Sequence, residues 1–526
     1  MKKYDIIIIG AGHNGLVCAG YLAKAKKKVL VIERRSIIGG ACSTEEIFKD
    51  CKVSRASYVL SLFQPEIIKD LKLHKYGLEL LQRTPSSFSP FPNNSYLLLG
   101  QNKQKDLEEI QKFSKKDAEN YINYQNKLSN LVKIITYWWD KTPPRIPKPE
   151  FTDFVSISKF LLKKRNITPV EVETLLDLFT KSTNDWLSEW FESEELKSTL
   201  ATDGIIGSYL SPNTPGSAYL LLHHVLGNLF HKPGKWAYVK GGMGNLCNAL
   251  KQSIIDLGVD IKTNQTVTQI TTNNNKSTGI IINNEKHIES KCIVSSLDIH
   301  QTTLKLLKDT QLPIEYIQRI KNIDYSSPVM KLNLQLSELP YFKAFKEKGL
   351  QPYHQATIHI SPSIEYIEKA YNESMNNLVS TNPILECTIP TSIDNSLTKG
   401  NDHLMGIFCQ YAPKNYNPKQ INKTQIETNI INLLSKFAPN LKKIIKNSEI
   451  LLPHDIENIY SLTGGNIFQG NMTLNHLFSF RPTIQYPMYC TPIKNLFLCG
   501  SATHPGGGVT GAPGKNASQQ ILRKLK

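Results

Sequence analysis

The chain opens with Ile6-Ile7-Ile8-Ile9-Gly10-Ala11-Gly12-His13-Asn14-Gly15, and this stretch decides the fold. Four consecutive isoleucines are typical of a buried parallel strand, and Gly10, Gly12 and Gly15 complete the G-x-G-x-x-G pattern of a dinucleotide-binding turn. The glycines allow a tight turn, a close approach of the backbone to a pyrophosphate, and close packing of the next helix. That helix would direct its N-terminal N–H groups at the phosphates. The stretch therefore predicts an α/β, Rossmann-type domain.

An acidic residue follows the second predicted strand. Glu33 comes directly after Val29-Leu30-Val31-Ile32, 18 residues beyond Gly15. A carboxylate here accepts hydrogen bonds from ribose hydroxyls and repels a 2′-phosphate, so the pattern indicates NAD or FAD. Arg35 can bind phosphate oxygens, although a solvated loop arginine is an equal alternative. Gly39-Gly40-Ala41 resembles the extended element of FAD-binding amine oxidases and phytoene desaturases, in which the chain turns back under the pyrophosphate.

A second glycine-rich turn lies at the far end of the chain. Asn495 to Gly500 is a short apolar run, and a helix is predicted over 516–525 after the turn. Such a turn offers a further set of N–H groups at a helix N-terminus. In the same superfamily this segment returns to the N-terminal fold and holds the flavin. The resemblance identifies the cofactor as FAD and implies contacts from Gly500, Gly508, Thr510, Gly511 and Ala512.

Length and composition restrict the class of protein. The chain has 526 residues, which is too long for one core, and its 40% hydrophobic content is that of a globular protein. The net charge of +17 comes from scattered lysines with no recognised nucleic-acid module, so no nucleic-acid partner is expected. No run approaches the roughly 18 apolar residues of a membrane span. A cytoplasmic protein is expected, with peripheral contact to an acidic membrane as the alternative.

The nine cysteines indicate neither a metal site nor a redox pair. None of them forms C-x-x-C, and no ligand set for a metal is apparent. In flavin disulfide reductases a C-x4-C pair follows the same Gly-Gly turn. Here Cys42 occupies the first position, but the partner position is Ile47. We therefore do not expect a dithiol redox cycle at that site, and we expect the cysteines to be reduced and structural.

The FAD-binding elements fall in three separated segments. We predict a discontinuous FAD-binding domain over 1–60, 236–299 and 490–526, with Val267 among its cofactor contacts. The inserts 61–235 and 300–489 would then build an α+β substrate domain. The first insert is predicted to be mainly helical, and the second to contain an antiparallel sheet. In Val329 to Leu336, for example, apolar and polar residues alternate cleanly.

Several further stretches carry a family resemblance. They are Val53 to Leu62, Asp203 to Gly207, Ser211 to Ser217 with Leu222-His223-His224, Gly464 to Phe468, and Cys499 to Gly514. They resemble the pyridine nucleotide-disulphide oxidoreductase domain-containing protein 2 family, which is similar to bacterial phytoene desaturases. The resemblance implies a glutathione reductase-like or amine oxidase-like FAD fold.

The resemblance also implies a reaction. A flavin removes hydride, so we expect an FAD-dependent oxidoreductase of the dehydrogenase or desaturase type acting on a hydrophobic small molecule. A flavin amine oxidase and a flavin-binding interaction protein with weak catalysis are the alternatives. His504 and Arg55 are the candidate catalytic residues, as a polar group beside the flavin and as a cation that stabilises its reduced form. Their alternatives are a structural imidazole and a plain salt bridge. Of His223 and His224, at most one is expected to reach a pocket. Substrate, electron acceptor and oligomeric state stay open.

Overall fold

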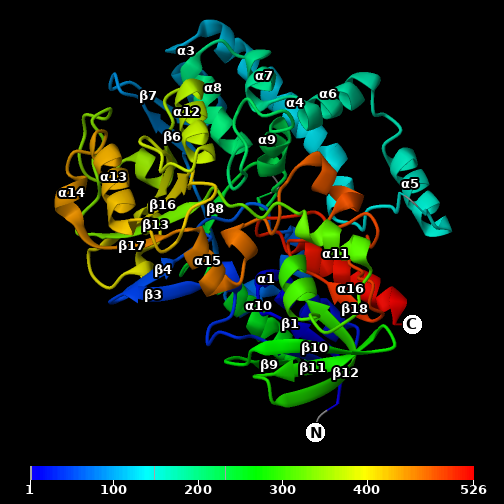
Figure 1. Cartoon of the computed structure of the whole chain (residues 1–526). Helices are drawn as coiled ribbons and strands as arrows, with labels where there is room; N and C mark the ends of the chain where they lie inside the picture. Colours follow the sequence, from blue (N-terminus) through cyan, green and yellow to red (C-terminus); the bar gives the residue numbers. More distant parts are fainter. Residues whose placement is uncertain (1–2, 147, 231–232, 526) are drawn as a thin grey trace.

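The computed structural model describes residues 3–146, 148–230 and 233–525, and it contains two seven-stranded sheets (Figure 1). The outer limits of the predicted FAD-binding domain, residues 1 and 526, lie outside the described residues. All strands of the first sheet fall within 1–60, 236–299 and 490–526, and all strands of the second fall within 61–235 and 300–489.

The first sheet is arranged around the isoleucine strand. Its order is β10-β11-β12-β1-β2-β9, with β18 also paired to β12. β1 runs parallel to both β2 and β12, and β12 runs parallel to β18. The first half of the long β12 instead forms an antiparallel hairpin with β11. The strands are β1 (Tyr4–Ile9), β2 (Val29–Ile32), β9 (Asp260–Lys262), β10 (Val267–Asn273), β11 (Lys276–Ile282), β12 (Lys286–Ser295) and β18 (Leu496–Leu498).

Both faces of this sheet are covered, which explains the unbroken apolar run in β1. Ile6 and Ile8 pack into a core shared with α1 (His13–Lys24), α10 (Gly244–Asp256) and α16 (Ala512–Lys524). Ile7 and Ile9 pack on the opposite side, against apolar residues of β10 and β11. The C-terminal helix α16 begins four residues before the predicted start at 516, because Pro513 is compatible with the first turn of a helix.

The second sheet has the order β17-β13-β16-β15-β14-β6-β7 and is antiparallel except where β14 meets β6. The predicted strand at 329–336 is β13, and the first insert contributes two strands that its helical pattern did not indicate, β6 and β7. The strands are β6 (Ser87–Pro90), β7 (Tyr96–Leu99), β13 (Met330–Leu336), β14 (Thr357–Ile360), β15 (Ile384–Thr388), β16 (His403–Gln410) and β17 (Ile445–Leu451).

Two short pairs of strands lie outside the two large sheets. β3 (Thr44–Phe48) and β4 (Cys51–Ser54) form a hairpin, while β5 (Leu80–Gln82) pairs with β8 (Ala237–Val239). The predicted boundary at 236 therefore falls just before a strand that pairs with the first insert.

Helices fill the rest of both inserts. The first insert carries α2 (Pro65–Asp70), α3 (Lys103–Gln111), α4 (Lys115–Trp139), α5 (Phe151–Lys163), α6 (Pro169–Thr180), α7 (Thr183–Ser188), α8 (Glu194–Ala201) and α9 (Ala218–Val225). The second carries α11 (Ile314–Lys321), α12 (Ile364–Met375), α13 (Lys423–Ser435), α14 (Leu441–Ile444) and α15 (Pro453–Tyr460). In the described parts of the chain, none of the helices has the length and apolar character needed to cross a membrane.

Substitution in the central strand tests this layering. Ile8 is fully buried in β1, so Ile8→Ala should cost about 2–5 kcal/mol and lower the melting temperature by several degrees. Ile37 is 38% exposed, and Ile37→Ala should leave the melting temperature nearly unchanged. Calorimetry of the two variants checks this, and equal melting temperatures would contradict the placement of β1.

Candidate cofactor and substrate site

A cavity of about 570 Å³ lies between the two sheets. Gly10, Glu33 and Ser296, which directly follow β1, β2 and β12, line one side of it. Lys331 and Phe408 of the second sheet line another part. A crevice at the carboxyl ends of parallel strands is where such folds bind nucleotides. The cavity therefore joins a nucleotide-binding edge to a wall built by the inserts.

The three glycines of the first turn meet different constraints. Gly10 has a φ of +91°, and a Cβ there would lie 2.5 Å from Ser296 Oγ. A Cβ on Gly15 would lie 2.4 Å from the Gly10 carbonyl oxygen. A Cβ on Gly12 would meet no atom within 4 Å, although Gly12 lines the cavity. The packing of the protein's own atoms therefore requires glycine at positions 10 and 15. At position 12, the absence of a side chain instead leaves space in the cavity for a bound molecule.

Glu33 is held in place while part of its carboxylate stays available. Its Oε2 accepts the N–H of Ala11 at 2.9 Å, and its Oε1 accepts the N–H of Arg35 at 2.9 Å. An ionised carboxylate has about four acceptor sites, so ribose hydroxyls can still bind. The Arg35 guanidinium also lines the cavity, but it donates to Glu45 at 2.8 Å and lies over the Tyr460 ring.

The Gly-Gly turn lies beside the first turn. Gly39 donates its N–H to the Ala11 carbonyl at 2.9 Å and has a φ of +107°, which favours glycine. Most of the predicted cofactor residues meet at the cavity. Those that line it are Gly10, Gly12, Gly15, Glu33, Arg35, Gly39, Gly40, Ala41, Val267 and Gly508.

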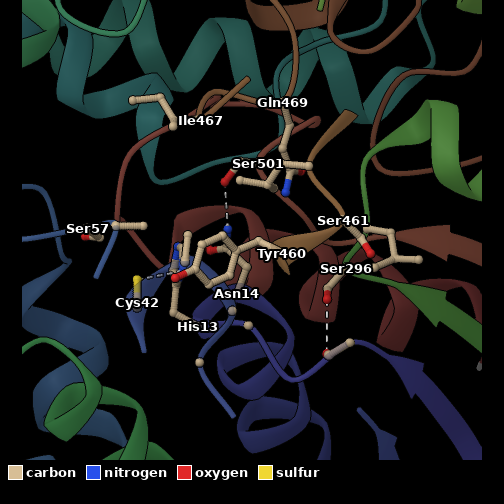
Figure 2. A pocket seen from close by; sticks show the side chains of 18 of the residues that line it. His13, Asn14, Cys42, Ser57, Ser296, Tyr460, Ser461, Ile467, Gln469 and Ser501 are labelled. Atoms are coloured by element: carbon tan, nitrogen blue, oxygen red, sulfur yellow. Dashed lines mark hydrogen bonds between the residues drawn. The ribbon is translucent and has the colours of Figure 1, made fainter. Parts of the chain in front are cut away.

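The C-terminal turn reaches the same space because β18 pairs with β12. Ser501 and Val509 line the cavity with Gly508, and Asn14 donates to Ser501 Oγ at 3.1 Å (Figure 2). The remaining predicted contacts here are not among the lining residues. These are Gly500, Thr510, Gly511 and Ala512.

Close packing explains why Gly500 and Gly511 do not line the cavity. A Cβ on Gly500 would lie 2.4 Å from the Ser296 carbonyl oxygen, and Gly511 precedes α16 in a left-handed conformation. These two glycines determine the conformation of the C-terminal turn and do not line the cavity.

The chain fits FAD on three observations of its own. The space over Gly12 is open, Glu33 retains acceptor sites, and two buried polar atoms near the turn have no hydrogen-bond partner among the residues that the structure describes. These atoms are His13 Nε2 and Asn14 Oδ1, whose residues both line the cavity. Figure 2 shows His13, Asn14, Cys42 and Ser501 gathered around this part of the site.

His504 does not have the position expected of a catalytic group. It is 3% exposed, is absent from the lining, and its Nε2 lies 2.9 Å from the Trp138 carbonyl oxygen. Burial lowers the pKa of His504 to about 4, so the imidazole is neutral and donates to that carbonyl. The alternative, a structural imidazole, describes its place: it fastens the C-terminal turn to the end of α4.

Arg55 is likewise outside the lining. Its guanidinium bonds Glu449 of β17, with Nη2 2.6 Å from Oε1, and reaches Glu45 at 3.3 Å. The salt-bridge alternative therefore describes Arg55, which connects the β3–β4 hairpin to the second sheet. We assign no catalytic part to Arg55 or His504.

Both histidines of α9 line the cavity, contrary to the expectation that at most one would. They lie in the last turn of this short helix, and the helix end rather than one face borders the space. Neither ring nitrogen of His223 has a hydrogen-bond partner among the described residues, and burial lowers its pKa to about 3. A neutral His223 can thus contact a bound molecule.

A row of side chains across the second sheet was missed by sequence reasoning. Strand register places Lys331, Phe408, Glu386 and His359 side by side on β13, β16, β15 and β14. The polar side of β13 faces inward, since all seven of its residues are buried. The signal available in the sequence was Lys331 among the polar positions of an alternating strand.

Lys331 is the most unusual member of this row. It lines the cavity at 1% exposure, and its Nζ has no hydrogen-bond partner among the described residues. The ammonium lies 4.2 Å from the centre of the Tyr58 ring. Burial lowers the pKa of Lys331 to about 7, so neutral and charged forms coexist near neutrality.

Glu386 extends the row away from the cavity. Tyr58, which lines the cavity, donates its hydroxyl to Glu386 Oε2 at 3.2 Å, and His359 Nδ1 lies 3.6 Å from Oε1. Burial raises the pKa of Glu386 to about 8. Perturbed groups of this kind gather at functional sites.

One thiol also borders the site. Cys42 lines the cavity with its Sγ 3.5 Å from His13 Nδ1, and Cys247 of α10 is its hydrogen-bonded neighbour. Ile47, at the position of the reductase partner thiol, packs in a separate cluster with β3 and β4. The nine cysteines are all free.

The Gly12 position separates cofactor binding from folding. Gly12→Val should fold, because the Cβ of the new side chain has no protein atom within 4 Å, yet it should abolish FAD binding by filling the open space. Gly10→Ala should instead destabilise the fold, through its left-handed φ and the contact with Ser296. Far-ultraviolet circular dichroism and flavin absorbance of both variants check this. A Gly12→Val protein with a full complement of flavin would refute the assignment.

The buried ammonium of Lys331 should lower the free energy of unfolding. The folded pKa of about 7 lies below the usual 10.5, so the cost of burying the ammonium is complete below pH 7 and fades as pH rises to 10.5. Lys331→Met should therefore raise the melting temperature, more at pH 6 than at pH 10. Lys291→Met, at a side chain 81% exposed, is the control that should change little. A lowered melting temperature for Lys331→Met would contradict an unpartnered ammonium.

Comparison with known proteins agrees with this geometry. The whole chain is 38% identical to pyridine nucleotide-disulfide oxidoreductase domain-containing protein 2 of Rattus norvegicus and covers 94% of that protein. It is 24% identical to a limonene dehydrogenase chain of Castellaniella defragrans, with 100% and 95% of the two chains covered. It is also 24% identical to phytoene desaturase of Fusarium fujikuroi, with 99% and 90% covered.

A solved structure and a family description complete the comparison. A variant of putrescine oxidase has the same fold, with a TM-score of 0.64 at 14% identity over 99% of this chain and 98% of the other. Residues 15–522 match the family described as flavin-containing amine oxidoreductase. The chain therefore belongs to the flavin-containing amine oxidoreductase family and is an FAD-dependent oxidoreductase.

Proposed function

We propose that the protein is a desaturase-like dehydrogenase that oxidises a neutral, hydrophobic small molecule. The observation that carries the proposal is the wall of the cavity opposite the nucleotide-binding edge. That wall is mostly apolar, and it includes Lys331, whose Nζ has no hydrogen-bond partner in the described part of the chain. Its apolar residues are Leu62, Ile206, Val329, Phe408, Ile467 and Phe468.

The charges of the cavity favour a neutral substrate over an amine cation. Among the described residues that line it, Glu33 is the single carboxylate, and it belongs to the nucleotide-binding end. A protonated amine at the other end would meet the Lys331 ammonium and no compensating acid. Like charges in a buried site repel strongly. The names of two relatives, a limonene dehydrogenase and a phytoene desaturase, agree with a hydrocarbon-like substrate.

Bound FAD supplies the hydride acceptor, and the residues present fit it as described above. Dehydrogenation also releases a proton, which a side chain must accept. We assign this to Lys331 Nζ, because a pKa of about 7 makes the neutral amine available near neutral pH. The centre of the Tyr58 ring lies 4.2 Å from Lys331 Nζ, and the Tyr58 hydroxyl donates to the Glu386 carboxyl, which is outside the cavity lining.

The apolar wall has a second task in this scheme. It excludes water from the space in front of the nucleotide-binding edge, which keeps the Lys331 amine desolvated and its pKa low. His223 and His224 stand at the border of the same space, where the neutral His223 imidazole can orient a substrate without adding charge.

Anaerobic mixing of the FAD-loaded protein with two panels of compounds tests the proposal. Terpenoid hydrocarbons should bleach the flavin absorbance, and primary amines should not. Lys331→Met should slow the bleaching about 100-fold or more, while Lys291→Met should not change it. Bleaching by amines alone would favour the amine oxidase alternative. Bleaching by neither panel would favour a flavin-binding interaction protein, and either result would overturn the proposal.

A further inference from the structure

The helix α5 carries an apolar face that no other part of the described chain covers. Phe151 is 80% exposed, Leu162 is 74% exposed and Leu161 is 61% exposed, with Phe154 also exposed. Spacings of three and seven to eight residues place these four side chains along one side of the helix. Exposed apolar surface of this density marks a contact with another molecule. We call these four residues the α5 face.

The opposite side of α5 anchors the helix to the protein. Phe160 packs on Tyr137 and Trp138 of α4, with ring centres 5.1 and 5.2 Å apart. Asp153 is buried and bonds Arg145 Nε at 2.7 Å. The α5 face is therefore turned outward by fixed contacts. Figure 1 shows α5 and α6 standing out at one edge of the molecule, away from both sheets.

Charge around the α5 face is strongly positive. Residues 141–165 contain seven lysines and arginines against two acids, Glu150 and Asp153. Arg145 pairs with both acids. The other six cations form no ion pair with the described residues, and they are Lys141, Lys148, Lys159, Lys163, Lys164 and Arg165. Lys141 and Lys163 lie over the Tyr137 ring, and Lys164 donates to the Lys133 carbonyl. Lysine and arginine beside an apolar helix face are the pattern of an interfacial helix on anionic lipid.

We propose that α5 docks the protein on the surface of an anionic lipid bilayer, with the α5 face in the acyl–headgroup boundary and the flanking cations on the lipid phosphates. A bilayer fits better than a second copy of the chain, because a second copy would bring together six unpaired cations from each side. The contact is peripheral, since one short helix provides the apolar surface. This inference goes beyond the oxidation proposed above and does not depend on it.

Neighbouring α6 limits the docking surface to α5 and its flanks. Val172 and Leu176 of α6 are exposed, but Glu171 caps the helix and Asp177 pairs with Lys181. Glu173 is exposed on the same helix and would repel lipid phosphates. The base of α6 packs through Phe179 on Tyr219 of α9, the helix whose histidines border the cavity.

Sedimentation of the FAD-loaded protein with vesicles tests the proposal. Wild type should bind vesicles of phosphatidylcholine with phosphatidylserine, release them at high salt, and bind weakly to phosphatidylcholine alone. The double variants Phe151→Ser/Leu162→Ser and Lys159→Glu/Lys163→Glu should each lower the partition coefficient roughly tenfold or more. Flavin content and circular dichroism should stay unchanged, because all four side chains are exposed.

Matched control variants distinguish binding through the α5 face from nonspecific effects of surface hydrophobicity and net charge. Ile314→Ser removes a side chain that is 73% exposed on α11, and Lys291→Glu reverses an exposed charge on β12; both should bind vesicles as wild type does. Three results would overturn the proposal. These are no binding of wild type to acidic vesicles, undiminished binding by the α5 variants, and conversion of a dimer to a monomer by those variants without loss of vesicle binding.

Discussion

The parallel pairing of β12 with both β1 and β18 is the constraint on which the site depends. It brings the ends of strands separated by nearly the whole chain to one edge, so the turns after Ile9, Ser295 and Leu498 meet. Asn14 and Ser501 bond across this junction, and Ser296 Oγ donates to the Gly10 carbonyl at 3.0 Å. Because each turn is packed against the others, a side chain on Gly10, Gly15 or Gly500 would collide with backbone or with the Ser296 hydroxyl. The open space over Gly12 is the exception, and it is where the nucleotide belongs.

The second sheet completes the site at a cost in stability. A sheet normally buries one apolar face, but here the polar face of β13 is also buried, and Lys331 and Glu386 lie there with perturbed pKa values. Buried ionisable groups without full partners are destabilising, so their presence beside a cavity is better explained by chemistry than by folding. Arg55 and His504 show the opposite case. The Arg55 guanidinium pairs with Glu449 and Glu45, and His504 Nε2 bonds the Trp138 carbonyl, so these side chains hold the hairpin and the C-terminal turn in place. His504 Nδ1 has no hydrogen-bond partner among the described residues.

Local patterns made the nucleotide-binding half predictable from sequence. The isoleucine run, the glycine spacing and Glu33 each have one simple physical interpretation. The structure places the glycines and Glu33 at the cavity, and the isoleucine run forms the strand that leads to it. Catalytic roles for His504 and Arg55 could not be decided in this way, because a loop residue can face either side of its loop. Lys331 was missed because the alternation of apolar and polar residues shows only that the two faces of the strand differ. It does not show whether other parts of the protein cover the polar face. That information lies in strand register, which joins residues over 70 positions apart.

Quantifying the flavin held per chain, as the sum of the flavin released on denaturation and the flavin still attached to peptides after proteolysis, tests the central claim most directly. The arrangement of Gly12, Glu33 and the C-terminal turn predicts one non-covalently or covalently held FAD per folded chain, with its adenosine part intact. A folded protein that purifies without flavin and takes up none when FAD is added would contradict it. So would a protein that binds riboflavin phosphate in place of FAD, because Glu33 and the first turn would then have no ligand.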